Sequence, residues 1–228
     1  MTKPARFELF AFWRTSATYR VRVALNLKGI TAEERIVDLD GNEHRSEAFL
    51  AVNPMGAIPA MIDREAPGPV PPITQSLAIL EFLDEVHPAS PILPRDVYGR
   101  ARVRSLASML VADTHPLIAP RVIKYLTETA KFDDAALRAW RVNWLTTGLR
   151  AFEQRLQTEA ETGTFCHGDD IGMADICLAS IRIVLPLFKI DITDTPVSDR
   201  IFAACQAHEA FAKAAPLKQA GAPDTNAR

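Results

Sequence analysis

The sequence predicts a small α/β domain followed by an all-helical domain, and two observations support this prediction. Strand-like and helix-like segments alternate over the first 87 residues, whereas nearly every later segment places its apolar residues with helical period. Between the two halves, residues 88–94 contain three prolines and form the clearest linker of the chain. We therefore expect an α/β domain at 1–87, a linker at 88–96, a helical domain at 97–218 and a tail at 219–228.

The first domain reads βαβ and then ββα. Apolar runs bounded by Gly, Pro and polar residues predict its strands, and apolar residues three and four apart predict its helices. In chain order we expect a strand at 7–12, a helix at 18–28, a strand at 34–38, a short helix or loop at 42–52, strands at 58–62 and 70–74, and a helix from Gln75-Ser76 to His87-Pro88.

Helical period dominates the second domain and predicts helices at 97–112, 117–130, 134–159, 173–188 and 199–215. His115-Pro116 interrupts the pattern between the first two, because proline cannot donate a backbone hydrogen bond. Asp175 stands three residues after Gly172, which is the spacing of a capping box. Ile171 and Ile176 are placed as its hydrophobic staple, so we assign this motif a structural role.

The composition is that of a globular protein, and it excludes several classes of function. A net charge of -2 gives no electrostatic basis for binding nucleic acid or a membrane surface. No apolar run is long enough to span a bilayer, and the N-terminus lacks the apolar region of a signal peptide. Cys166, Cys177 and Cys205 are odd in number and lack metal-site spacing, so we expect free thiols, a cytoplasmic protein and no bound metal.

The most informative segment is the run from Phe12 to Leu25, where three aliphatic hydroxyls and three arginines follow a strand-like segment. A strand-to-helix turn rich in Ser and Thr offers hydroxyl donors and unpaired helix N–H groups to an anion. A thiolate is such an anion, and a helix N-terminus lowers the pKa of a thiol. Because no Cys occupies the turn, the thiol would come from a ligand. The alternative is that Ser16 or Thr18 is a simple helix N-cap.

Two further motifs each allow two interpretations. Pro59 begins a strand, where it is either an ordinary trans residue or follows a cis bond that turns the backbone groups of Ile58 toward an extended peptide. Gln75-Ser76 precedes a helix, where it either binds a carboxylate or simply caps the helix.

Together these motifs resemble the zeta class of glutathione transferases, which includes maleylacetoacetate and maleylpyruvate isomerases. The resemblance covers roughly residues 7–216. Its most specific marker is Thr15-Ser16-Ala17-Thr18-Tyr19-Arg20-Val21-Arg22, where the class has Ser-Ser-Cys, an aromatic residue and Arg-Val-Arg. The other motifs follow in family order: Asn53-Pro54-Met55 with Ile58-Pro59, Gln75-Ser76-Leu77-Ala78-Ile79, His115-Pro116-Leu117, and Gly168-Asp169 with Met173-Ala174-Asp175.

The resemblance implies a thioredoxin-like first domain, a helical-bundle second domain, a homodimer and glutathione as cofactor. It also implies roles for single residues. Thr15, beside Ser16, would hydrogen-bond the glutathione sulfur, and Ile58 would pair with the cysteinyl backbone. Gln75 and Ser76 would hold the γ-glutamyl group. His44 would contact the peptide, and His115, which by itself reads as a structural hydrogen-bonding residue, would line the site.

Three positions depart from the pattern of the class. Ala17 replaces the cysteine of the marker, Ala119 falls where isomerases tend to have asparagine, and Leu187 replaces an arginine that holds a substrate carboxylate. A maleyl diacid carries two negative charges, and desolvating it without paired cations costs roughly several kcal/mol. Candidate replacements for the missing cation are Arg14, Arg121 and Arg182.

These departures favour a more apolar acceptor pocket. We therefore expect a glutathione-dependent transferase in which a thiolate adds to a small electrophilic substrate. The first alternative is cis-trans isomerisation of maleylacetoacetate or maleylpyruvate, in which the thiolate adds to the cis double bond, the resulting single bond rotates, and elimination returns the thiolate. The second alternative is a binding module without catalysis, which retention of the hydroxyl turn, Ile58-Pro59 and Gln75-Ser76 argues against.

Overall fold

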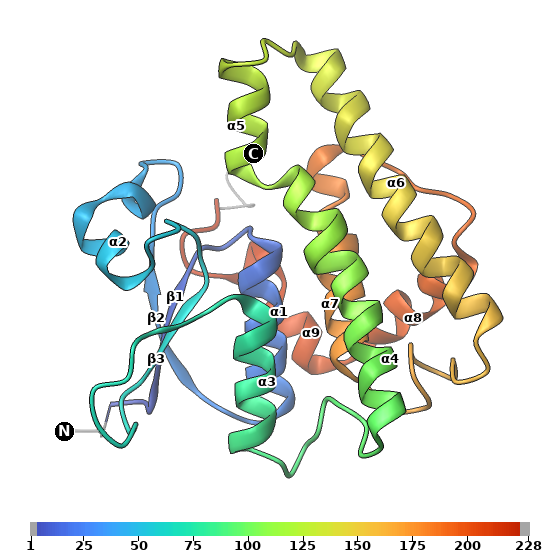
Figure 1. Cartoon of the computed structure of the whole chain (residues 1–228), viewed down its shortest axis with the longest axis horizontal. Helices are drawn as coiled ribbons and strands as arrows, with labels where there is room; N and C mark the ends of the chain where they lie inside the picture. The colour runs from blue at the N-terminus through green and yellow to red at the C-terminus, as the bar shows by residue number, and fades with distance from the viewer. Residues whose placement is uncertain (1–3, 224–228) are drawn as a thin grey trace. The chain divides into compact units, whose positions relative to one another are not determined.

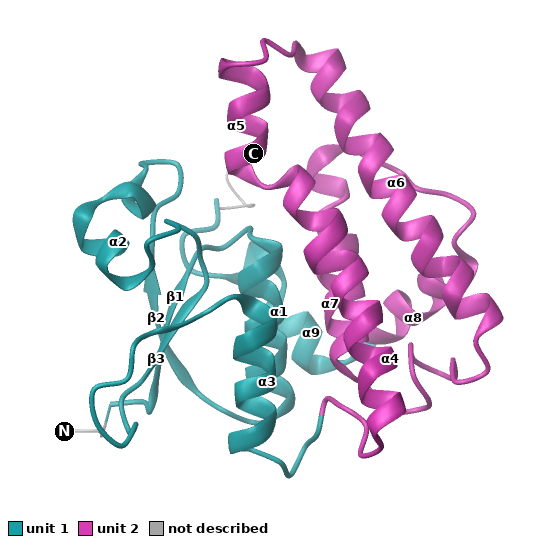
Figure 2. Cartoon of the chain, in the orientation of Figure 1, with its two compact units in different colours: residues 1–91, 207–228 teal, residues 92–206 magenta. Residues whose placement is uncertain are grey.

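The structure is a computed structural model that describes residues 4–223. The chain forms two compact units (Figure 2). Of the described residues, the first unit contains 4–91 and 207–223, and the second unit contains Ile92–Gln206. The C-terminal segment thus lies with the first unit, whereas the sequence placed residues up to 218 in the helical domain.

The first unit is built on a four-stranded sheet with the order β2-β1-β3-β4. The central strand β1 (Phe7–Ala11) pairs in parallel with β2 (Ala32–Ile36) and antiparallel with β3 (Ala60–Asp63). The edge strand β4 (Ile73–Thr74) pairs antiparallel with β3. This arrangement confirms the predicted βαβ-ββα order and the thioredoxin-like fold class.

Helices cover both faces of the sheet (Figure 1). The helices α1 (Ser16–Leu27) and α3 (Ser76–Val86) pack together on one face, where the ring of Phe7 lies 6.2 Å from that of Phe82 on α3. On the other face, α2 (Glu47–Val52) follows a 3-10 turn at Glu43–Arg45 and packs Phe49 against Phe10, with ring centroids 5.8 Å apart. Strand β1 is therefore buried on both sides, which explains why four of its five residues, all except Glu8, are apolar and buried.

The C-terminal helix α9 (Glu209–Ala214) belongs to the first unit because it packs on α1. Its apolar residues Ala210, Phe211 and Ala214 are buried, and Asn26 on α1 donates from Nδ2 to the Ala210 carbonyl at 2.9 Å. The 3-10 turn η5 (Pro216–Lys218) follows. The sequence showed the apolar pattern of α9, but the pattern does not say which apolar surface it covers.

The second unit is helical, as predicted. Its elements are α4 (Val97–Ser108), the π-helical segment η2 (Met109–Thr114), the 3-10 turn η3 (His115–Ile118), α5 (Pro120–Glu128), α6 (Asp134–Thr158), α7 (Met173–Arg182), the 3-10 turn η4 (Pro186–Phe188) and α8 (Pro196–Ala207). Every residue of α7 is buried, so this helix forms the centre of the core. The break predicted at His115-Pro116 is confirmed.

The last two predicted helices differ most from the structure. Helix α7 ends at Arg182 and not at residue 188, because Pro186 cannot donate a helical hydrogen bond. The helix predicted at 199–215 is two helices, since α8 ends at Ala207 and α9 starts anew after His208, whose Nδ1 accepts from the Ala210 N–H at 3.2 Å.

The capping box is present as predicted, with glycine at the N-cap. Asp175 Oδ2 accepts from the Gly172 N–H at 2.8 Å, and Oδ1 accepts from the Cys166 N–H at 2.8 Å. Burial raises the pKa of Asp175 above its usual value even though these N–H donors oppose the shift. This buried carboxylate holds the 166–172 loop onto the start of α7.

Within residues 4–223, no helix is both long and apolar enough to cross a membrane.

Candidate active site

The turn before α1 presents the hydroxyl cluster that the sequence singled out. Thr15 is the helix N-cap, and its Oγ1 accepts from the Thr18 N–H at 3.3 Å. The alternative that Ser16 or Thr18 is the cap is therefore wrong, because Ser16 is already the first helical residue. Thr15 Oγ1 also donates to Thr18 Oγ1 at 2.7 Å. Hydroxyl protons rotate to suit their acceptors, so with an anion bound Thr15 can turn its proton to the anion while Thr18 donates to Thr15.

The helix behind this turn adds a favourable field for negative charge. Helix α1 has 12 residues, and its first turn contains no acidic side chain to neutralise the N-terminal end of the macrodipole. The hydroxyl of half-buried Thr15 and that of buried Ser16 both sit at this end. The geometry fits stabilisation of a thiolate.

The protein's own thiols are not suited to this chemistry. Cys166, Cys177 and Cys205 are free and buried. Burial, with Asp175 nearby, raises the pKa of the Cys166 and Cys205 thiols above the usual value, which keeps both protonated. A reactive thiolate at the α1 turn would come from a bound molecule, as the sequence indicates.

The loop before β3 is held by Asn53, which is buried. Its Nδ2 donates to the Ala57 carbonyl at 2.5 Å, and its Oδ1 accepts from the Met55 N–H at 3.1 Å. The Ile58–Pro59 bond that follows is cis, which confirms the bond geometry of the second interpretation, whereas pairing of Ile58 with an extended peptide stays a prediction.

His44 lies against this loop. A Cβ atom on Gly56 would stand 2.8 Å from the His44 carbonyl oxygen, and Gly56 has a φ of 56°. Only glycine accommodates both the left-handed backbone and the close approach. The 3-10 turn that carries His44 and the loop that carries Ile58 are therefore adjacent in the first unit.

The start of α3 brings Gln75 and Ser76 together in an unusual backbone conformation. Gln75 has φ 68° and ψ 118°, although it is not glycine. Such conformations cost about 1–3 kcal/mol and cluster at binding and catalytic sites. Ser76 is the first residue of α3, is buried, and accepts at Oγ from Arg20 Nε at 2.9 Å. The sequence did not assign a role to Arg20, but its position four residues after Ser16 places both on one face of α1.

The proposed substrate cations differ in how far they are already paired. Arg14 lies 2.5 Å from Asp40 and packs over the Trp13 ring, with 44% of its side chain exposed. Exposed pairs contribute about 0–1 kcal/mol, so a substrate carboxylate can compete with Asp40 for Arg14. Arg182 is excluded as a free cation because Asp199 and Thr195 hold its guanidinium.

In the second unit, His115 is half-buried at the start of η3, and Arg121 is exposed in the first turn of α5. Among residues 4–223, no carboxylate forms an ion pair with Arg121. Leu187 is 44% exposed on η4, and Ala119 is buried. His115 and Arg121 are therefore the candidates within the helical unit.

Arg141 on α6 is one further cation, which was not predicted from the sequence. Its guanidinium packs over the ring of Phe188, the neighbour of Leu187, at 5.4 Å. Its Nε is buried and has no hydrogen-bond partner among the described residues. The signal that could have found it is the helical spacing from Arg138, which donates to the Lys189 carbonyl at 3.0 Å and so faces the same turn.

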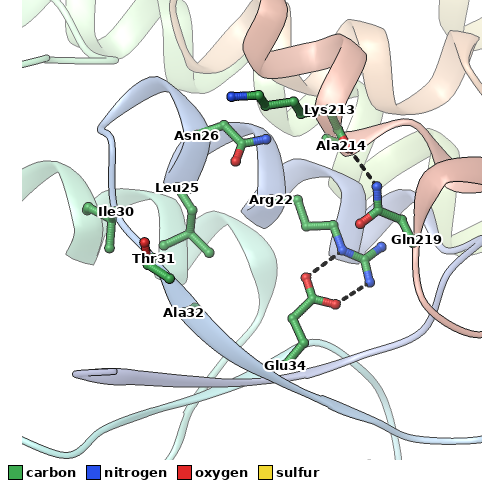
Figure 3. Close-up of a pocket in the computed structure, with 10 residues that line it drawn as sticks. All are labelled: Arg22, Leu25, Asn26, Ile30, Thr31, Ala32, Glu34, Lys213, Ala214 and Gln219. Atoms are coloured by element: carbon green, nitrogen blue, oxygen red, sulfur yellow. Dashed lines mark hydrogen bonds and ion pairs between the residues drawn. The ribbon is translucent and has the colours of Figure 1, made fainter. Parts of the chain in front are cut away.

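The first unit has a cavity of about 230 Å³. Figure 3 shows the residues that line it, which come from α1, β2 and the C-terminal segment. Arg22 lies in it and pairs with Glu34 through two bonds of 2.7 Å. None of the predicted site residues lines this cavity. Its polar side chains bond one another and the backbone, as Gln219 does to the Lys213 carbonyl at 2.7 Å.

Comparisons with known proteins find a matching family and relatives that are similar over most of the chain. The family model described as "Glutathione S-transferase, N-terminal domain" matches residues 16–86. The chain is 38% identical to a maleylpyruvate isomerase of Ralstonia sp., over 93% of this chain and 98% of the relative.

Solved structures of isomerases are also similar to this chain over nearly its whole length. A maleylacetoacetate isomerase of Methylobacterium extorquens AM1 with bound malonate and GSH is 44% identical, with a TM-score of 0.90, over 95% of this chain and 99% of that one. A maleylpyruvate isomerase described as a bacterial zeta-class glutathione S-transferase is 37% identical, with a TM-score of 0.89, over 95% and 100%.

A thioredoxin-like unit with hydroxyls at the start of its first helix, joined in sequence to a helical unit, defines a class of thiol-binding enzymes. The chain belongs to the glutathione transferase family, in its zeta class. Members of this class are enzymes with glutathione as cofactor, so the interpretation as a binding module without catalysis is set aside.

Proposed function

We propose that this protein is a glutathione-dependent cis-trans isomerase of a small maleyl diacid such as maleylacetoacetate or maleylpyruvate. The observation that carries the proposal is near-full-length similarity to isomerases in both sequence and structure. The relatives therefore favour the isomerase alternative over the broader thiolate transfer that the sequence placed first.

The donor set of the first unit fits glutathione. A hydroxyl pair at a helix N-terminus suits a thiolate, and a second helix N-terminus with Ser76 suits the carboxylate of a γ-glutamyl group. Bound glutathione supplies a thiolate that adds to the cis double bond, allows rotation about the carbon–carbon bond and leaves again, so it is not consumed.

The chain's own residues perform three tasks in this scheme. Thr15 and the α1 N-terminus stabilise negative charge on sulfur, with Ser16 beside them. Ile58 and His44 border the peptide, and Gln75 and Ser76 hold its γ-glutamyl end. His115 stands at the start of η3, where we place it at the edge of the substrate pocket.

The diacid needs cations, and Leu187 supplies none. Arg121 and Arg141 are the candidates within the helical unit, because neither forms an ion pair among the described residues. The half-buried guanidinium of Arg141 has no carboxylate partner among the described residues, which is energetically unfavourable, and a substrate carboxylate would relieve that cost. Arg14 adds a third candidate from the first unit.

A spectrophotometric assay of maleylpyruvate with catalytic glutathione tests the proposal. We expect loss of the cis isomer with the total thiol concentration unchanged. Arg121→Gln and Arg141→Gln should each raise KM for the diacid roughly 10-fold, the value of one lost charged hydrogen bond. Arg138→Gln is the matched control, because it removes an arginine of the same helix that already bonds backbone carbonyls.

A second candidate function, conjugation or dehalogenation of an apolar electrophile, is favoured by one observation, the exposed Leu187 in place of a cation. Stoichiometric consumption of thiol with aryl or halide acceptors, without turnover of maleylpyruvate, would establish it in place of the isomerase.

We also propose a cytoplasmic homodimer. The three free buried cysteines fit a reducing compartment. Val97 and Tyr98, at the start of α4, leave 72% and 85% of their surface exposed, which is unusual for large apolar side chains. Light scattering after gel filtration should give twice the mass of one chain, and Tyr98→Asp should shift the protein toward the monomer.

A further inference from the structure

Arg20 is a buried cation that the roles assigned so far leave without a function. It lies on α1 with 1% of its surface exposed and is the largest fully buried side chain of the chain among residues 4–223. Burying a guanidinium costs free energy unless hydrogen bonds hold it in place. One of the bonds that hold Arg20 runs from its Nε to Ser76 Oγ at 2.9 Å.

This bond determines what the Ser76 hydroxyl can do. The Ser76 oxygen accepts from Arg20, and a guanidinium has no acceptor, so the hydroxyl proton is directed elsewhere. Among residues 4–223, Ser76 donates that proton to no other residue. A donor that itself accepts from a cation is polarised, which strengthens the hydrogen bond that it gives. Ser76 is therefore prepared to donate to an anion.

The position of Ser76 reinforces this preparation. It is the first residue of α3, a helix of 11 residues, and therefore lies at the positive end of the helix dipole. The charge of Arg20 stands directly behind it. Two positive contributions converge on one hydroxyl, an arrangement that favours a carboxylate and disfavours a neutral amide.

Arg20 also joins the two helices that carry the two ends of the proposed glutathione site. Helices α1 and α3 pack together, with Thr15 at the start of α1 and Ser76 at the start of α3. We propose that Arg20 is a positioning residue that acts through Ser76: it orients and polarises the Ser76 hydroxyl and so sets the selectivity of the site for the α-carboxylate of the γ-glutamyl group. The inference rests on the proposed glutathione site.

Titration calorimetry with two ligands tests this role. One ligand is glutathione, and the other is its analogue in which 4-aminobutanoyl replaces γ-glutamyl, which removes only the α-carboxylate. For the unaltered protein we expect glutathione to bind roughly 10- to 100-fold more tightly than the analogue. The ratio of the two Kd values is the readout, because a loss of folding or general packing weakens both ligands alike.

Arg20→Met should lower this ratio by about fivefold or more, the coupling typical of residues in contact. Ser76→Ala should lower it similarly, and the double variant should fall no further than either single one. Arg20→Lys keeps the charge but loses the Nε geometry, so it should lower the ratio less than Arg20→Met. It serves as the test variant if Arg20→Met does not fold.

Arg22→Met is the matched control. Arg22 is also a buried arginine of α1, but its guanidinium pairs with Glu34 on β2 (Figure 3). It should leave the ratio unchanged whatever its effect on stability. An unchanged ratio in the Arg20 variants would overturn the role of Arg20, whereas no glutathione binding by the unaltered protein would overturn the proposed function itself.

Discussion

Replacement of Thr15 by alanine tests the proposed thiolate site most directly. Thr15 Oγ1 performs two separable tasks: it caps α1 through the Thr18 N–H at 3.3 Å, and in our proposal it donates to the glutathione sulfur. Loss of a threonine N-cap costs about 1 kcal/mol of folding free energy. Loss of one hydrogen bond to a charged group costs about 1.5–3 kcal/mol, which corresponds to a rise of about 1–2 units in the pKa of the bound thiol.

The assay is a pH titration of the ultraviolet absorbance of the thiolate in the glutathione complex, with a denaturation curve measured in parallel. Thr15→Ala should raise the thiol pKa, lower turnover at neutral pH and reduce stability. Thr15→Ser should keep all three properties close to those of the unaltered protein, because serine supplies both the cap and the donor. Ser16→Ala should change the thiol pKa less, since in our proposal Thr15 and not Ser16 donates to the sulfur. A larger pKa change in Ser16→Ala would assign the sulfur to Ser16 and refute our reasoning.

Three further predictions concern the framework around the site. Gly148→Ala on α6 should destabilise the protein by about 1–3 kcal/mol in urea denaturation, because the new Cβ would stand 2.1 Å from Thr114 Oγ1, and Thr114→Ala in the same chain should recover part of the loss. Gln75→Gly should be more stable than Gln75→Ala by about 1 kcal/mol, since glycine adopts a φ of 68° without strain. Both variants should bind glutathione less tightly than the unaltered protein. Equal stability of the two variants would contradict strain at this residue. Glu153 is buried on α6, and its burial alone would raise its pKa, but hydrogen bonds from Ser198 and from the Val197 N–H lower the pKa below the usual value. The stabilising contribution of Glu153 is therefore present above the unfolded-state pKa of about 4.3 and is lost as the pH falls through the lower folded-state pKa. Glu153→Gln should lower the free energy of unfolding at pH 7 by about 1–3 kcal/mol and flatten its dependence on pH in the acid range. An unchanged acid dependence would refute this assignment.

Most of the fold could be predicted from the sequence because its signals are local. Alternating and helical periods located the strands of the first unit and most helices of the second, and the Gly172 and Asp175 spacing located the cap of α7. The failures have two causes. The separate start of α9 depends on a local cap by His208, which the helical period does not reveal, whereas the place of α9 in the first unit depends on the distant α1 surface that it covers.

The candidate site, like the fold, combines features that a short motif predicts with features that only long-range contacts determine. The hydroxyl turn, Ile58-Pro59 and Gln75-Ser76 were visible as motifs, because each is a short run with its own backbone requirement. That Thr15 is the N-cap, and not Ser16 or Thr18, needed the helix geometry. The exclusion of Arg182 as a free cation needed Asp199, which lies 17 residues away in the chain.

The sequence by itself therefore determined the two-unit fold class, the hydroxyl-bearing turn and the family to which the chain belongs, since these depend on periodicity and on motifs a few residues long. Only the tertiary structure decided which cations remain available and which hydroxyl a buried arginine polarises. Arg20 and Ser76 are 56 residues apart, and their contact exists because α1 and α3 pack on the same face of the sheet. Pairing and burial are properties of such long-range contacts, and no local pattern in the chain encodes them.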